Sequence, residues 1–395
     1  MSELAAQLLD WRASLLERLP PWWRRAGVAG LIVVALILPL GLAQTSGFLN
    51  ATVIALAYVV MALGLNVVVG FAGLLDLGYV AFFAIGAYAA GWLGSGFFFH
   101  GNIHVGVSKL ANQLPGVHLN FALILVAAVI LTSISGTLIG LPTLRLRGDY
   151  IAIVTLGFGE ITRVFAVNGD SIHVLGGTLT AGRQGITPVD PPHFPIVGTF
   201  DQLHLRPWYW TILVIVLLVV FVNVRVRDSR LGRAWIALRE DEVAAVSMGI
   251  PLVRTKLLAY ATGAAFGGIS GAFLGAYYNE VNADQFQFSF SIFVLAMIIV
   301  GGLGSIWGAV LGALLLSYIN YYLIPDVLNG LPATFGLKFN LTDLSFGIFG
   351  FLLVLVMVLR PQGLFPERRR KVELTEGIAA RTGGGDDPGA LEVHA

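Results

Sequence analysis

Long apolar runs separated by short polar segments cover most of the chain. They occupy residues 27–43, 48–69, 79–97, 120–141, 149–167, 208–225, 256–278, 289–301, 303–322 and 342–360. A helix needs about 20 apolar residues to cross the hydrocarbon core of a bilayer. Lipid also requires that every backbone polar group be satisfied within the structure. The pattern therefore predicts an all-α polytopic membrane protein with about ten transmembrane helices.

One of these runs is too short for a full crossing. Residues 289–301 are followed at once by Gly301, Gly302 and Gly304, which predicts a broken or tilted helix there. Residues 67–73 and 298–304 are both Gly-centred and weakly alike. They could mark an internal repeat of the kind found in many transporters, or only the small-residue packing of any membrane bundle.

Basic residues set the predicted topology, because cytoplasmic loops collect Lys and Arg. They cluster in residues 12–25, at Arg145 and Arg147, in 225–256 and in 360–371. An even number of spans with an inside N-terminus places all four clusters in the cytoplasm, so both termini are predicted to be cytoplasmic. The segments 98–119, 168–207, 279–288 and 323–341, which carry few bases, are then outside.

The same pattern divides the chain into three parts. Residues 1–26 form a cytoplasmic N-terminal segment, either an amphipathic helix on the membrane or a loosely ordered tail. Residues 27–365 form the transmembrane domain, with a large cytoplasmic loop at 226–255; the run at 27–43 is interpreted as a retained span, not a cleaved signal. Residues 366–395 are polar and Gly-rich, and are predicted to be disordered.

Composition excludes several functions. The chain is 56% hydrophobic and 12% charged, whereas soluble domains carry about 25% charged residues. A net charge of +1 gives no basic field for nucleic acid. The absence of cysteine excludes disulfides and thiol chemistry. His100 and His104 have no nearby carboxylate, so no metal site is expected, and no nucleophile–base pair indicates a catalytic residue.

No energy source is visible in the sequence. A phosphate-binding loop needs Gly directly before Lys, but the four lysines follow Ser108, Thr255, Leu337 and Arg370. The chain is therefore predicted not to be an enzyme, to have no ATPase site and to bind no cofactor. Ionisable residues are few within the predicted spans, which argues mildly against proton coupling.

Three ionisable residues in or beside the predicted spans receive specific predictions. Glu160 and Arg163 lie three apart in the fifth predicted span and could pair on one helix face. Asp76 falls in a short turn between the second and third spans, and is expected near the cytoplasmic surface.

Residues 229–250, called the coupling segment below, carry the strongest local signal. Leu231, Trp235 and Leu238 share one helical stripe, and a phase slip before Val243 and Val246 predicts two short helices. Gly249 and the following Pro251 should end the second helix. Small residues beside charges suit docking into a groove on a soluble partner. An ordinary amphipathic loop on the membrane is the alternative.

Five segments together resemble one known family, the second membrane subunit of branched-chain amino acid ABC importers. They are residues 64–88, 144–160, 232–242, 294–305 and 360–364, and the match covers roughly residues 50–365. The resemblance implies a type II importer architecture in the bacterial cytoplasmic membrane. It also implies a related second permease subunit, two ATPase subunits that hold ATP and Mg²⁺, and a binding protein that delivers leucine, isoleucine or valine from outside.

The resemblance also assigns candidate residues. The coupling segment would contact the ATPases through Arg233, Arg239, Glu240, Asp241, Glu242, Ala244, Ala245 and Gly249. The coupling loop of importers carries the pattern Glu-Ala-Ala…Gly. Here Val243 interrupts that pattern and Gly249 comes sooner, so the contact of each residue with the ATPases is left open. Candidates for the translocation path are Gly70, Gly73, Tyr79, Phe82, Phe83, Glu160, Gly301, Gly302 and Gly304. Helix packing is the alternative for each of them, and a satisfied intrahelical pair is the alternative for Glu160.

Three other functions stay open at this point. A closely related ABC permease for urea or short amides would share the same motifs. A stand-alone secondary transporter or channel would move solute without ATPase subunits. A non-transporting membrane scaffold would need no broken helices, and the Gly-rich breaks count against it.

Overall fold

The computed structural model describes residues 22–99, 101–107, 111–144, 146, 148–174, 177–193, 200–201, 203–329, 344–360 and 363–365. Most of the predicted N-terminal segment and the whole tail at 366–395 lie outside the described residues. The predictions made for them therefore stay predictions.

Each of the ten predicted runs overlaps a helix. The helices are α2 (Trp22–Ile37), α3 (Gly47–Leu65), α4 (Val80–Leu93), α5 (Phe121–Thr143), α6 (Asp149–Asn168), α7 (Leu205–Arg227), α10 (Leu252–Tyr278), α11 (Phe288–Gly301), α12 (Ile306–Tyr318) and α14 (Ser345–Leu359). Among the described residues, six helices are long and apolar enough to cross a membrane. The all-α polytopic class is thus confirmed, while the number of crossings stays a prediction.

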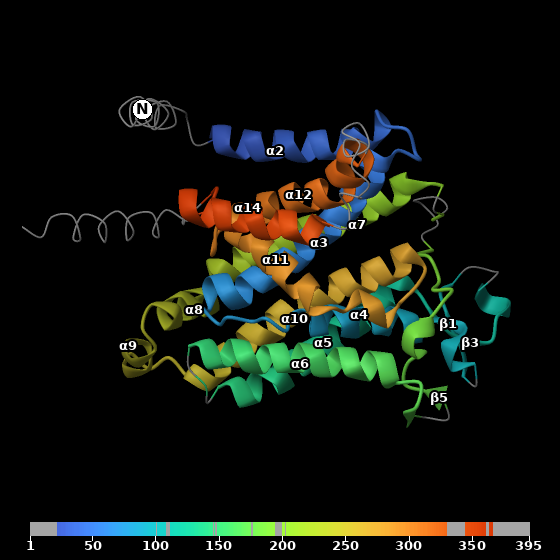
Figure 1. Cartoon of the computed structure of the whole chain (residues 1–395), viewed down its shortest axis with the longest axis horizontal. Coiled ribbons are helices and arrows are strands. Elements are labelled where there is room, and N and C mark those ends of the chain that lie inside the picture. Colours follow the sequence, from blue (N-terminus) through green and yellow to red (C-terminus); the bar gives the residue numbers. More distant parts are fainter. Residues whose placement is uncertain are drawn as a thin grey trace, which may run out of the picture.

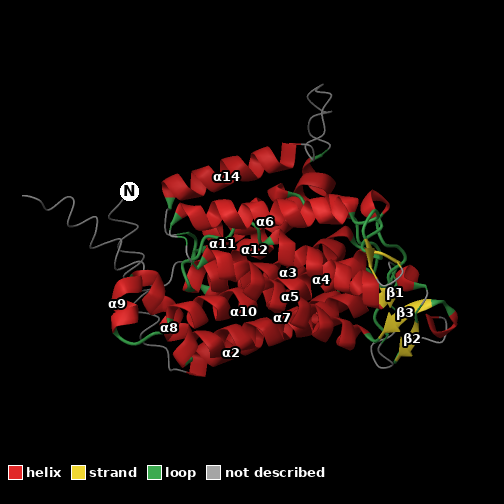
Figure 2. Cartoon of the chain, turned by 90° about the horizontal axis from the view of Figure 1, so that it is seen from below, coloured by secondary structure: helices red, strands yellow, loops and turns green. Residues whose placement is uncertain are grey.

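The helices pack side by side, and the two ends of the bundle differ (Figures 1 and 2). Short helices α8 (Arg230–Glu240) and α9 (Glu242–Ser247) project at one end, and the strands lie at the other. There β3 (Gly116–Leu119) pairs with β1 (Gly94–Ser95) antiparallel and with β2 (Asn102–Val105) parallel. A second pair joins β4 (His173–Val174) to β5 (Gly177–Thr178).

Helix α10 packs in the centre of the bundle against α3, α4 and α5. Glycines form the seam: an added Cβ at Gly86 would lie 2.2 Å from the Gly268 carbonyl oxygen, and one at Gly271 would lie 2.0 Å from that of Phe83. Small residues let helix backbones approach this closely in a membrane bundle, where lipid supplies no hydrophobic driving force.

Two helix breaks meet inside the bundle. Helix α3 continues as a π-helix, η2 (Asn66–Phe71), and then as a non-helical segment up to α4. Helix α11 ends at Gly301, and Gly302 and Gly304 have φ of +121° and +82°. This confirms the predicted break. The Gly304 amide donates to Asn66 Oδ1 at 2.9 Å, and a Cβ added at Gly70 would lie 2.7 Å from the Gly304 amide nitrogen, so the two Gly-centred segments that resemble each other are in contact.

The non-helical segment between η2 and α4 enters the protein interior. The Leu77 amide donates to Thr155 Oγ1 at 3.0 Å, and at the end of the segment the amide of Val80, the first residue of α4, donates to Ser291 Oγ at 3.0 Å. Irregular backbone is tolerated at membrane depth only where protein or water satisfies it. Asp76 lies in this segment and is buried within the protein; its expected position near the cytoplasmic side of the membrane stays a prediction.

Candidate functional site

The coupling segment folds as two short helices, as its phase slip predicts. Helix α8 ends at Glu240 and α9 begins at Glu242. Asp241 stands between them, and its Oδ1 accepts hydrogen bonds from the amides of Val243 at 2.8 Å and Ala244 at 3.0 Å. This N-cap starts α9 as a separate helix after α8. Gly249 follows with φ of +85°, a conformation that favours glycine.

Buried contacts fix the coupling segment to α10. Trp235 is fully buried, and its Nε1 donates to the Thr255 carbonyl oxygen at 2.8 Å. Lys256 of α10 pairs with Glu242 at the start of α9. These two contacts attach α8 and α9 to the start of α10.

The outer face of α9 is apolar and exposed. Val243 is 69% exposed and Met248 85% exposed, and Val246 and Ala244 lie beside them at the surface. Apolar side chains grouped on a projecting element indicate a protein contact. Ala245, by contrast, is only 4% exposed. Its prediction as a docking residue is corrected: one helical position separates the outward Ala244 from the inward Ala245.

Arg239 connects the coupling segment to the broken span. Its Nη1 donates to the Gly70 carbonyl oxygen at 2.5 Å, within the π-helix η2. A Cβ added at Gly73 would lie 2.7 Å from Arg239 Cγ, and Gly73 has φ of +70°. The end of α8 thus packs directly against the point where α3 breaks.

Most of the candidate path residues are buried in contacts within the subunit. Tyr79, Phe82 and Phe83 are almost fully buried, and the Tyr79 hydroxyl donates to the Gly263 carbonyl oxygen at 2.6 Å. Gly70 lies close to Gly304, Gly301 to Gly308, and Gly302 to Gly363. The Gly304 amide bonds to Asn66. These contacts explain the residues by helix packing. That they line the translocation path stays a prediction.

Glu160 differs from the other path candidates. Its Oε2 accepts a hydrogen bond from Arg163 Nε at 3.0 Å, which confirms the predicted pair. The side chains are 40% and 34% exposed respectively, on the outer face of α6.

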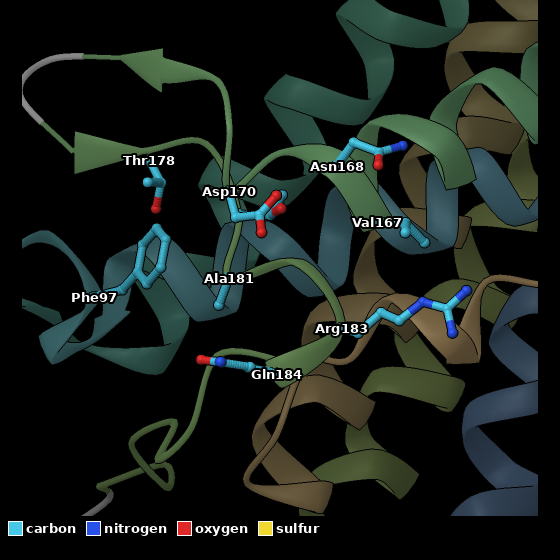
Figure 3. A pocket seen from close by; sticks show the side chains of 9 residues that line it. Phe97, Val167, Asn168, Asp170, Thr178, Ala181, Arg183 and Gln184 are labelled. Atoms are coloured by element: carbon cyan, nitrogen blue, oxygen red, sulfur yellow. The ribbon is translucent and has the colours of Figure 1, made fainter.

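A pocket lies at the strand end of α6 (Figure 3). It has a volume of about 500 Å³ and is lined by Phe97, Val167, Asn168, Asp170, Thr178, Thr180, Ala181, Arg183 and Gln184. Within the described part of the chain, neither Asp170 nor Arg183 has an ion-pair partner. The pocket therefore offers one free carboxylate and one free guanidinium.

Sequence reasoning missed four residues that hold these elements together: Asn66, Thr155, Ser291 and Lys256. Each is a polar residue in or beside an apolar run, which was the only available signal. Their partners are remote in sequence and could not be read from it. Over the residues that the structure describes, no group of three or more His, Asp or Glu could hold a metal ion.

A bundle of apolar helices with one broken span, contacted by two projecting short helices, is typical of the membrane subunit of a transporter. The chain belongs to the family described as "Branched-chain amino acid transport system / permease component", which matches residues 47–357.

Individual relatives agree with this family. The chain is 36% identical over 372 residues to the high-affinity branched-chain amino acid transport system permease protein LivM of Escherichia coli (strain K12), covering 89% of this chain and 77% of that protein. It is 27% identical over 328 residues to the probable LivM of Methanocaldococcus jannaschii, covering 79% and 91%. It is 34% identical over 110 residues to the E. coli permease protein LivH, covering 28% and 34%. No solved structure matches the chain.

Proposed function

We infer that this chain is the transmembrane permease subunit of an ATP-binding cassette importer for branched-chain amino acids in the bacterial cytoplasmic membrane. The observation that carries the inference is the family match over residues 47–357, and the contact between Arg239 of the coupling segment and Gly70 of the broken span supports the coupling role. The substrate comes from the printed names of the LivM relatives.

The importer would need further subunits. A second, related permease subunit is suggested by the likeness to LivH. Two ATPase subunits with bound ATP and Mg²⁺ would dock on α9, and an external binding protein would deliver the amino acid at the strand end. Both termini are then cytoplasmic, on the same side as α9. This subunit itself would hydrolyse no ATP and bind no cofactor.

Force would pass through contacts seen in the structure. Closure of the ATPases moves α9, and the buried Trp235 and the pair Lys256–Glu242 make α8, α9 and the start of α10 move together. Arg239 then transmits the displacement to η2. A π-helix is rare and frequently marks a functional site. Alternating access follows from two arrangements of this break.

Reconstitution tests the proposed function. Proteoliposomes containing the two permeases and the two ATPases are expected to take up leucine when loaded binding protein and ATP are supplied on the correct sides. The chain alone is expected to give no flux. Leucine flux through the chain alone would make it a secondary transporter or channel, and uptake of urea or short amides but not leucine would change the substrate.

Ala244→Glu is expected to reduce ATP-dependent uptake at least about tenfold, because it places bulk and charge on the docking face of α9. The substituted residue is exposed, so insertion and folding should be unaffected. Uptake by the purified complex and retention of the ATPases on the tagged permease are the two measurements.

Two matched variants control this result. Ala244→Ser keeps the small size and should keep the uptake. Ala122→Glu adds the same charge at an exposed alanine in the first turn of α5, where a carboxylate is favourable. If Ala244→Glu transported like Ala122→Glu, α9 would not be the docking element.

A further inference from the structure

A continuous stripe follows the outer face of α6. It consists of Tyr150, Ile153, Gly157, Glu160, Val164 and Asn168. Successive members are three or four residues apart, which places them on one helix face. Tyr150, Ile153 and Val164 are exposed, and a Cβ added at Gly157 would meet nothing within 4 Å. This α6 stripe leads from the coupling end of the bundle to the pocket of Figure 3, which Asn168 also lines.

The charges on this face are out of place against lipid. Glu160 lies roughly 16 Å along the helix from Asp149 at 1.5 Å per residue, near the middle of the span. Ionisable groups at this depth usually face a bundle interior or an aqueous cavity. In the isolated subunit Glu160 and Arg163 face neither, because both are partly exposed at the bundle surface. Something other than hydrocarbon must cover them.

The outer faces of other helices provide a contrast. The exposed residues of α5 include Leu123, Val126, Ile130 and Leu138, and α14 exposes Phe351 and Val358. These faces carry no ionisable residue and suit lipid directly. Unlike the faces of α5 and α14, the α6 stripe is therefore expected to contact a polar neighbour.

We propose that the α6 stripe is one wall of the substrate route, closed on its other side by the second permease subunit. Glu160 and Arg163 would bind the ammonium and carboxylate groups of an amino-acid zwitterion. The proposal rests on the proposed function and adds the residues that recognise the substrate. The likeness of this chain to LivH supports the choice of neighbour, because two related permeases can present matching faces to each other.

The pair matches the chemistry of the solute. An amino acid is neutral overall but carries one charge of each sign, as does the pair Glu160–Arg163. Each group can exchange its partner for the opposite charge of the zwitterion, so no unpaired charge is left in the span. The notch at Gly157 leaves room beside the pair for an aliphatic side chain.

The pocket of Figure 3 would receive the amino acid before it reaches the pair. It holds a free carboxylate from Asp170 and a free guanidinium from Arg183, and its volume of about 500 Å³ lies in the range of small-molecule sites. The polar pocket thus lies at the end of α6, and the pair Glu160–Arg163 lies near its middle.

The double variant Glu160→Leu/Arg163→Leu separates a ligand role from a structural one. The second permease would bury this pair, and replacing a buried ion pair by apolar residues is often neutral for folding, so a structural pair predicts retained uptake. The proposal predicts that leucine uptake by the full complex falls at least about tenfold, while the second permease and the ATPases still co-purify. Thr162→Ala, which removes a hydroxyl that among the described residues donates to the Phe158 carbonyl of the same helix, should transport like the wild type. Uptake above half the wild-type rate in the double variant would overturn the proposal.

Single cysteines give a second readout that does not depend on uptake, since the chain contains no cysteine of its own. In the assembled complex, Ile161→Cys, beside the stripe, should react with a small charged thiol reagent at least about tenfold faster than Val126→Cys on α5. Equal, slow reaction at both would place α6 against lipid and overturn the proposal. A wild-type complex without ATP-dependent leucine uptake would instead contradict the proposed function.

Discussion

Replacing Arg239 with methionine is expected to lower ATP-dependent leucine uptake at least about tenfold, because the charged hydrogen bond to the Gly70 carbonyl oxygen is lost. Methionine keeps the length and much of the packing against Gly73. The variant should therefore fold, assemble and still hydrolyse ATP. Uptake and ATP hydrolysis measured in the same proteoliposomes test this, and the ratio of leucine moved to ATP consumed should fall.

A matched variant on the same helix controls for the loss of a positive charge. Arg230 is exposed at the start of α8 and makes no hydrogen bond or ion pair among the described residues. Arg230→Met should keep wild-type coupling. A normal ratio in Arg239→Met, at normal assembly, would show that the contact with η2 does not transmit force.

Gly271→Leu is expected to prevent stable folding. The new Cβ would lie 2.0 Å from the Phe83 carbonyl oxygen and 2.9 Å from the Ala87 amide nitrogen, so α10 must move away from α4. Overpacking of this kind against rigid backbone costs about 3 kcal/mol. The yield of monodisperse protein in mild detergent and its apparent Tm should both drop.

Gly350→Leu is the matched control for this prediction. It makes the same substitution on α14, where an added Cβ has no neighbour within 4 Å. The control protein should be as monodisperse as the wild type. Equal behaviour of the two variants would mean that the seam between α4 and α10 is not close-packed.

The apolar runs were sufficient to predict the helices, because a segment in lipid must satisfy its own backbone hydrogen bonds. Each predicted run overlaps a helix, and the break after Gly301 follows from the glycines alone. The phase slip between Leu238 and Val243 likewise predicts the two helices of the coupling segment.

Tertiary contacts were not predictable in the same way. Nothing local distinguishes the exposed Ala244 from the buried Ala245, since the direction of each depends on how α9 is held by Lys256 and Asp241. Nothing local showed that the short segment containing Asp76 is buried within the protein. Its burial follows from contacts of that segment with Thr155 and Ser291, which are 78 and 211 residues away along the chain.

The path candidates show the same limit. Glycines and aromatic residues in a membrane bundle are typical both of packing and of a route, and the structure accounts for most of them as packing. Glu160 was identified by charge alone. Only its partial exposure on the outer face of α6, together with Arg163, turns that charge into a specific hypothesis.

The side of the membrane on which the coupling segment lies is the most direct test of the whole account. Val243→Cys introduces a single cysteine at a highly exposed position of α9. A membrane-impermeant thiol reagent should label it in inverted membrane vesicles freed of ATPase subunits, and bound ATPases should protect it. Intact spheroplasts should show no labelling. Labelling from outside the cell would place α9 away from any ATPase and would contradict both the coupling mechanism and the predicted topology.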